Sequence, residues 1–252
     1  MTSQPKVLIG TTTANGVVAS DYVMSLMRMT DDLRARGVRT ELRLIDGPNL
    51  MVQRDVLARE LLNSDASHLL LIGSSMRFPA DLCARLLASG KPVVGAIHPR
   101  GGVDLERLGA SVGVLPFEAA VARAHDWHVE LLDRTIRVQD GFCEVRAVGP
   151  GFLLIAREAI ARLAEGGRLP RYEFPAGKVV LTAFFRYFFG DDPPSDPEHA
   201  FCRRWRESGG AVWGFAAAPV GPVAEVHYGL PFSRMIAASS EPAPTGRDGG
   251  AV

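Results

Sequence analysis

Disulfide bonds, membrane spans and a basic binding surface are not expected of this sequence. Its 252 residues include three cysteines, none in a C-x-x-C pair, so we expect reduced thiols and a cytoplasmic location. No apolar run approaches the roughly 20 residues that span a bilayer, and no secretory signal is expected at the amino terminus. The formal net charge is zero, whereas nucleic-acid binding requires a clustered basic excess. These observations argue against secreted, membrane-embedded and nucleic-acid-binding classes.

The first part of the chain alternates short apolar runs with amphipathic stretches. Hydrophobic residues make up 47% of the sequence, enough to bury the core of one large domain. The patterns predict strands at 6–10, 38–45, 68–72 and 92–97, and helices at 21–36, at 50–62 and from Pro79 onward. Because the strands are almost continuously apolar, we predict a mostly parallel, Rossmann-like α/β sheet covered on both faces.

The second part has a different pattern. Residues 134–138 and 142–148 flank the turn 139–141 and suggest an antiparallel hairpin. Helices are predicted at 156–164 and 198–207, and a strand at 211–215. The Ser/Pro/Gly-rich tail, 238–252, is expected to be disordered. We therefore predict one α/β domain, 1–237, with an antiparallel second half.

Three blocks carry a resemblance to a known family. They are residues 49–100, residues 148–157 (VGPGFLLIAR) and residues 200–213 (AFCRRWRESGGAVW). In this order they resemble the GT-A-fold glycosyltransferases, close to glycosyltransferase family 2, over most of residues 5–230. The resemblance implies a GT-A fold with a nucleotide-binding half, 1–100, and an acceptor half, 101–237. It also implies a nucleotide-sugar partner and transfer of its sugar to an acceptor, which the sequence does not identify.

The chain departs from that family where a metal would bind. An Asp-x-Asp pair in such enzymes holds Mn²⁺ or Mg²⁺ against the donor diphosphate, because hard cations need anionic oxygen ligands. The matching positions here are Gly73, Ser74 and Ser75, and the family's metal-binding His matches Pro222. His227 could substitute only if its loop is rearranged. We therefore expect no metal cofactor, while residues 73–75 still line the donor site.

The resemblance also supplies a candidate general base. The aspartate that usually removes the acceptor proton matches Glu198, whose side chain is one methylene longer. The alternative is a first-turn acid that the helix dipole favours, and Pro197 at the first helical position, with Asp196 as N-cap, fits this alternative well.

Donor-binding candidates follow the strands of the expected sheet, where α/β proteins bind ligands. The loop with Thr11, Thr12, Thr13 and Gly16 matches the family's nucleobase loop, although it could be a plain polar loop. Guanidinium groups could replace a cation at the diphosphate, or could simply be exposed. Gly149 and Gly151 would let the backbone approach a ligand or turn sharply. The arginine candidates are Arg54, Arg77 and Arg100.

Three further clusters have simpler explanations. His125 and His128 could bind a metal, but a partly buried helix face fits the spacing better. Asp191, Asp192 and Asp196 could form a cation site, but a solvated loop is the simpler interpretation. The aromatic residues within 184–189 could stack on sugars, although core or an oligomer face is more usual.

Three hypotheses follow. The first is a glycosyltransferase that works without a divalent ion, with Glu198 as base. The second is a catalytically inactive pseudoenzyme that keeps the scaffold to bind a ligand or a partner protein. The third is a scaffold repurposed for other chemistry, because fold does not fix function. The sequence permits a homodimer without requiring one.

Overall fold

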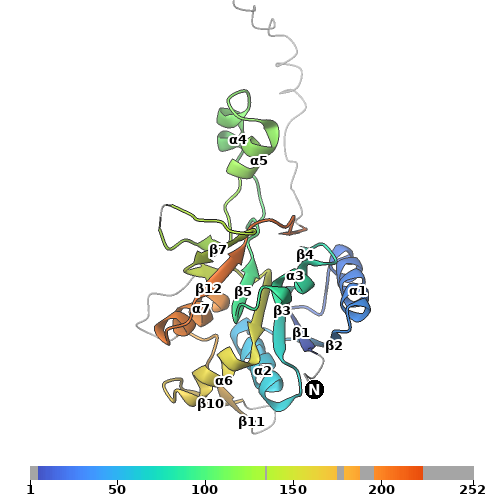
Figure 1. Ribbon diagram of the computed structural model, residues 1–252, viewed down its shortest axis with the longest axis vertical. Helices are drawn as coiled ribbons and strands as arrows, with labels where there is room; N and C mark the ends of the chain where they lie inside the picture. The colour runs from blue at the N-terminus through green and yellow to red at the C-terminus, as the bar shows by residue number, and fades with distance from the viewer. Residues whose placement is uncertain (1–4, 134, 175–178, 188–195, 224–252) are drawn as a thin grey trace, which may run out of the picture.

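The computed structural model describes residues 5–133, 135–174, 179–187 and 196–223, and a seven-stranded sheet forms its centre (Figure 1). The strand order is β2-β1-β3-β9-β5-β12-β7. Two strands, β7 (Phe142–Val145) and β9 (Phe152–Ala156), run opposite to the other five. This confirms the predicted α/β fold with a mostly parallel sheet and antiparallel strands from the second half. The five parallel strands are β1 (Lys6–Thr13), β2 (Arg39–Asp46), β3 (His68–Gly73), β5 (Val93–Ala96) and β12 (Val212–Phe215).

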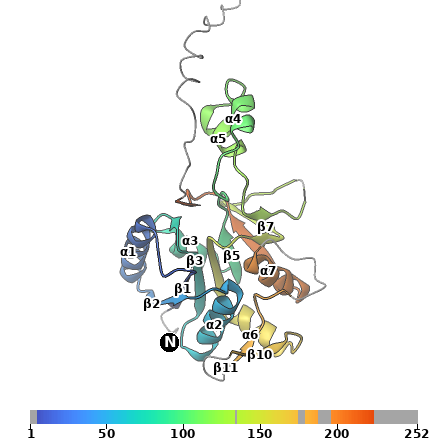
Figure 2. The same ribbon diagram turned by 180° about the vertical axis from the view of Figure 1, so that it is seen from behind.

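Helices cover both faces of the sheet, as predicted. One face packs against α1 (Ser20–Ala35) and α3 (Leu82–Ala88), and the other packs against α2 (Leu50–Asn63), α6 (Arg157–Glu165) and α7 (Pro197–Glu207) (Figure 2). Successive strand residues point to opposite faces, so Ile9 joins the α1 core while Leu8 joins the α2 core. The apolar strands are therefore buried on both sides.

Shorter elements surround this centre. The helices α4 (Leu105–Ser111) and α5 (Phe117–Arg123), which the sequence patterns did not predict, project beyond the carboxyl ends of the parallel strands (Figure 1). Three two-stranded sheets complete the description. They are β4 (Met76–Arg77) with β13 (Gly221–Pro222), β6 (Val129–Glu130) with β8 (Ala147–Val148), and β10 (Arg171–Phe174) with β11 (Val179–Thr182).

Several predicted boundaries need correction. The three threonines expected in a loop continue β1 to Thr13, because these β-branched residues pair with the end of β2. The expected hairpin is wrong: residues 135–138 form no strand, and β7 pairs with β12 instead. Only its turn is present, with Asp140 and Gly141 at positive φ. The helix expected from Pro79 begins at Leu82.

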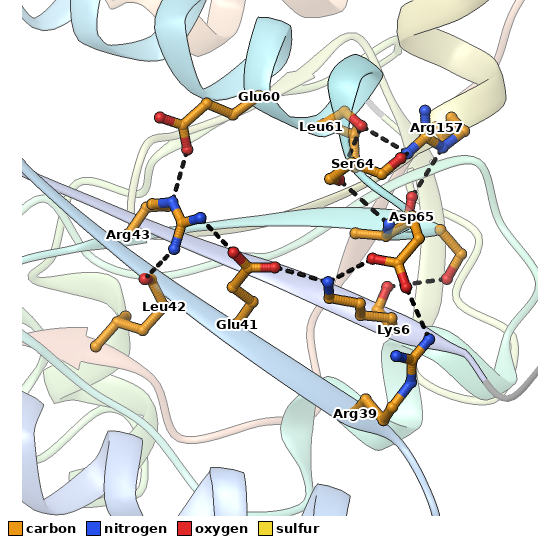
Figure 3. A network of polar contacts seen from close by, with 12 residues as sticks. Lys6, Arg39, Glu41, Leu42, Arg43, Glu60, Leu61, Ser64, Asp65 and Arg157 are labelled. Atoms are coloured by element: carbon orange, nitrogen blue, oxygen red, sulfur yellow. Dashed lines mark hydrogen bonds and ion pairs between the residues drawn. The ribbon is translucent and has the colours of Figure 1, made fainter.

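A network of charged residues lies along the first halves of β1 and β2 and beside the end of α2 (Figure 3). Lys6 lies between Glu41 and Asp65, and Arg43 Nε lies 3.0 Å from Glu60 Oε2. Beside them, the Arg157 guanidinium donates to carbonyl groups at and just beyond the end of α2, including Leu61 O at 2.6 Å. The last carbonyls of a helix lack their usual partners within it, so Arg157 caps the end of α2 and ties it to α6.

Two predictions concern segments that are not described or not tested. The tail 238–252 and His227 lie outside the described residues, and the single-domain boundary at 237 stays a prediction. Within the described part of the chain, no helix has the length and apolar character needed to cross a membrane.

Candidate functional site

The first part of the site lies where β1 and β2 end. Thr13 Oγ1 and the Gly16 amide both donate to Asp46 Oδ1, each at 2.7 Å, and these hydrogen bonds lower the pKa of Asp46. Thr11 Oγ1 lies 2.6 Å from the Tyr22 hydroxyl. The side chains of all three threonines are buried. A ligand at this place would therefore meet the β1 backbone and the Asp46 carboxylate more than the threonine hydroxyls. Asp46 was missed because the predicted strand ended one residue earlier.

The loop at residues 73–75 is held by its backbone. The Gly73 amide donates to Gly151 O at 3.0 Å, and the carbonyls of Ser74 and Ser75 accept from Ala19 N and Val223 N at 2.9 and 2.8 Å. Because β13 pairs with β4, Pro222 lies opposite Met76. The two segments that the resemblance matches with metal-binding segments are thus neighbours in space. The residues matched with metal ligands, Gly73, Ser75 and Pro222, carry neither a carboxylate nor an imidazole.

Gly149 and Gly151 bring the backbone against two histidines. A Cβ on Gly151 would lie 2.3 Å from His98 Nε2, and one on Gly149 would lie 2.4 Å from His128 Cβ. The Gly151 amide instead donates to His98 Nε2 at 3.0 Å, while His98 Nδ1 lies 2.9 Å from Pro99 O. These contacts fit a neutral imidazole protonated at Nδ1. Burial lowers the pKa of His98 to about 4, which keeps it neutral at pH 7.

Asp196 lies between two further imidazoles at the start of α7. Its Oδ2 is 3.6 Å from His128 Nδ1 and 3.7 Å from His199 Nε2, and the His128 ring lies 4.8 Å from that of His98. Burial by itself would raise the pKa of Asp196, but the contact with His128 and the charge and amide of His199 lower it below its usual value. Burial also lowers the pKa of His199.

His128 and His125 are not a pair. His125 Nδ1 lies 2.7 Å from Gly102 O, beyond the end of α5, whereas His128 faces Asp196. The expected helix face is therefore wrong. Among the described residues, no group of three or more His, Cys, Asp or Glu side chains is arranged to hold a metal ion. Asp191 and Asp192 lie outside those residues, so only Asp196 of the predicted acidic cluster is described.

Arg54 and Glu198 form a buried ion pair between α2 and α7. Arg54 Nε lies 2.7 Å from Glu198 Oε1, and their side chains are 2% and 0% exposed. Burial raises the pKa of Glu198, and the Arg54 charge opposes this effect. Asp196 is the N-cap, with Oδ1 3.1 Å from the His199 amide, and Pro197 opens the helix, as the structural interpretation predicted.

The remaining candidates lie apart. Arg77 is 75% exposed, with Nε 3.9 Å from Asp21 Oδ1, and Arg100 is exposed in the segment that leads to α4. The structure therefore does not bring the three predicted phosphate-binding arginines together. In the aromatic block, Phe184 and Phe185 belong to the core, which agrees with the simpler interpretation; Phe188 and Phe189 are not described.

One chain of contacts joins the parts of the site. The loop at 73–75 contacts Gly151, Gly151 contacts His98, His98 lies beside His128, and His128 faces Asp196. Sequence reasoning named the glycines but missed the roles of His98 and Asp46. Their only signal was position, since Asp46 is the last residue of β2 and His98 follows β5 by two residues.

Comparison with known proteins is informative for the fold alone. No protein-family model and no curated protein matches the chain. The crystal structure of A197 from STIV has a TM-score of 0.50 at 14% identity, covering 87% of this chain and 86% of that one. UDP-glucose pyrophosphorylase complexed with UDP-glucose matches with a TM-score of 0.42 at 8% identity, covering 86% of this chain and 92% of that one. The inositol-1-phosphate CTP transferase from T. maritima matches with a TM-score of 0.41 at 11% identity, covering 87% and 89%. The first likeness supports a shared α/β fold, and the other two carry no argument about function.

Proposed function

We propose that this chain is a GT-A-like, sugar-nucleotide-binding glycosyltransferase that transfers a sugar to an acceptor without a metal held by an Asp-x-Asp motif. The observation that carries the proposal is the contact between the two segments matched with metal-binding segments. Val223 N donates to Ser75 O, and Pro222 lies opposite Met76, as expected if both segments descend from one cation site. Their altered residues therefore belong to a single place in the fold.

Donor binding is proposed at the carboxyl ends of β1, β2 and β3. The Asp46 carboxylate and the threonine segment of β1 would contact the nucleoside, since both lie beside the strand ends where α/β folds bind ligands. The backbone at residues 73–75 and Gly151 would lie next to the diphosphate. Arg77 and Arg100 are exposed near this edge and could offset the charge that develops on the leaving group.

Two carboxylates are candidates for the general base. The resemblance points to Glu198, but its pairing with Arg54 leaves it no exposed surface. The geometry favours Asp196, because a base must come within hydrogen-bond reach of the acceptor hydroxyl. Its side chain is 10% exposed, and contacts with His128 and His199 lower its pKa, so it is ionised at neutral pH. In this proposal, the Arg54–Glu198 pair fixes the start of α7 and so positions Asp196.

Donor binding can be tested by titration calorimetry with uridine, guanosine and thymidine diphosphate sugars, each with Mn²⁺ and with EDTA. We expect one of them to bind the wild type equally well in both conditions. A Gly73→Asp/Ser75→Asp variant is the matched control, because it restores carboxylates at the matched positions and should make binding respond to Mn²⁺. Strong dependence of the wild type on Mn²⁺ would refute the metal-independent proposal.

Transfer can be tested by following release of the nucleoside diphosphate. Asp196→Asn should abolish release while leaving donor affinity nearly unchanged, if Asp196 is the base. If Asp196→Asn stays active and Glu198→Gln is folded, binds donor and is inactive, the base is Glu198 instead.

A catalytically inactive sugar-nucleotide-binding protein is the second candidate function. The observation that favours it is the Arg54–Glu198 pair. Arg54 was predicted to bind phosphate and Glu198 to act as the base, but in this pair each side chain is engaged with the other. Donor binding by calorimetry without nucleoside diphosphate release, across a panel of sugar and lipid acceptors, would support this candidate over the enzyme. No binding of any nucleotide would point instead to a repurposed scaffold.

A further inference from the structure

The edge strand β2 has an unpaired side. Arg39 N donates to Pro5 O and Gly47 N donates to Thr13 O, each at 3.0 Å, so the odd-numbered residues direct their backbone groups toward β1. The N–H and C=O groups of neighbouring strand residues point in opposite directions within a sheet. Thr40, Leu42 and Leu44 therefore direct theirs outward, where no described strand pairs with them.

This edge has few of the usual protections against pairing with another strand. Protected edges are short, carry proline or a bulge, or carry charged side chains, lysine above all. β2 has eight residues and no proline or lysine, and its charged residues, Arg39, Glu41, Arg43 and Asp46, carry two charges of each sign. Leu42 and Leu44 are 48% and 53% exposed. Two exposed leucines thus accompany the open backbone groups of β2.

The charges on β2 favour one self-pairing. In antiparallel pairing of two identical strands about a two-fold axis at Leu42, Leu42 faces its own copy and Thr40 faces Leu44. Glu41 of each copy then faces Arg43 of the other, in the non-hydrogen-bonded position where side chains are closest. Moving the axis by one residue either way, to Glu41 or to Arg43, pairs two glutamates or two arginines, which is unfavourable. The alternating charges therefore suit a second copy in this register.

Neighbouring charges extend the match. Within one copy, Glu41 contacts Arg43, Lys6 Nζ lies 2.7 Å from Glu41 Oε2, and Arg43 Nε lies 3.0 Å from Glu60 Oε2 (Figure 3). Both side chains are already held on the α2 face of the sheet. Pairing would therefore join two networks of alternating sign while the leucines meet on the other face.

We propose that two copies of this chain associate through antiparallel pairing of their β2 strands, centred on Leu42, so that the two central sheets become one. This inference does not depend on the proposed enzymatic function, because it is argued from residues 40–44 of β2 and uses no residue of the candidate site. The partner is a second copy of the chain, because a two-fold axis at Leu42 by itself places opposite charges, and the unpaired backbone groups of the two strands, against each other.

Sedimentation velocity over a concentration series tests this surface. Wild-type protein should dimerise, whereas Leu42→Lys and Leu42→Glu should each raise the dimer dissociation constant by about tenfold or more, because each places like charges opposite one another. An equimolar mixture of these two variants should recover a heterodimer, because Lys then faces Glu. Circular dichroism should show that each variant is folded.

Leu105→Lys is the matched control, because Leu105 is 73% exposed on α4, away from β2, and its replacement should leave dimerisation unchanged. A monomeric wild type, a Leu42→Lys variant that remains dimeric, or a mixture that fails to recover the dimer would each overturn the proposal.

Discussion

Replacement of Arg54 by methionine should destabilise the protein by about 3–5 kcal/mol, the usual cost of removing one partner of a buried ion pair. Methionine can fill much of the space of the arginine stem, so packing loss should be the smaller part of the effect. The larger part comes from Glu198, which would keep its charge without a partner at 0% exposure, or take up a proton. Glu198→Leu should be costly for the converse reason, since Arg54 cannot lose its charge.

The double variant Arg54→Met/Glu198→Leu distinguishes this electrostatic cost from simple loss of packing. With no buried charge left, it should be more stable than either single variant, because apolar replacements of buried pairs are often neutral or stabilising. The control is Glu144→Gln, which breaks the Arg206–Glu144 pair at 3.2 Å near the surface. That change should cost less than about 1 kcal/mol.

The assay is equilibrium unfolding in urea at pH 7, with each midpoint converted to a free energy through a common slope. Non-additivity of several kcal/mol across the cycle is expected. Additive effects would refute the reasoning, because they would mean that Arg54 and Glu198 do not interact in solution. Single variants as stable as the wild type would likewise contradict a buried, mutually dependent ion pair.

Three further perturbations probe the histidine and carboxylate environments. Gly151→Ala should displace His98, because the added Cβ would lie 2.3 Å from His98 Nε2. Calorimetry should then show weaker binding of the proposed donor. Gly109→Ala is the control and should leave donor binding unchanged, because no atom lies within 4 Å of its added Cβ. Burial lowers the pKa of His98 from 6.5 to about 4, so its contribution is complete above pH 6.5 and about 3 kcal/mol is lost as the pH falls toward 4. Urea unfolding of His98→Gln should lack this dependence, and an unchanged profile would contradict the assignment. Asp55 is a buried residue of α2 that accepts hydrogen bonds from the Tyr172 hydroxyl and the Phe185 amide. Burial raises the pKa of Asp55 from 3.8 to about 7, so its contribution has the opposite sign and about 4 kcal/mol is lost as the pH rises between those values. Asp55→Asn should remove that loss, and a profile that keeps it would place the titration elsewhere.

Local patterns predicted most of the sheet but not its pairings. The strands β3 and β5 and the helix α2 lie within one or two residues of their expected limits, because apolar runs and caps such as Asn49 are local signals. The pairing of β7 with β12 is different. A turn at residues 139–141 indicated a hairpin between neighbouring segments. β7 instead pairs with β12, which lies about seventy residues later in the chain, and so covers the edge of the parallel strands. No local pattern carries that information.

The site divides in the same way. Gly149 and Gly151 could be predicted as site residues, because glycine before a strand indicates close approach of the backbone to another group. The sequence could not identify that group, which is a histidine in each case. The ion pair was harder still. Arg54 and Glu198 were each assigned a separate role from matched motifs, and only the packing of α2 against α7 brings them together. Long-range charge pairing therefore changes the interpretation of both residues.

The two segments matched with metal-binding segments illustrate why spatial adjacency matters. Residues 73–75 and 221–223 are far apart in sequence, but pairing of β4 with β13 makes them one surface. If the proposed donor binds here, a lone carboxylate left without a cation would place an uncompensated charge close to the donor diphosphate, which repels it. Loss of one carboxylate ligand would therefore favour loss of the other. Gly73, Ser75 and Pro222 are all neutral, as this reasoning expects, and the proposed function would then leave the diphosphate to backbone amides and exposed arginines.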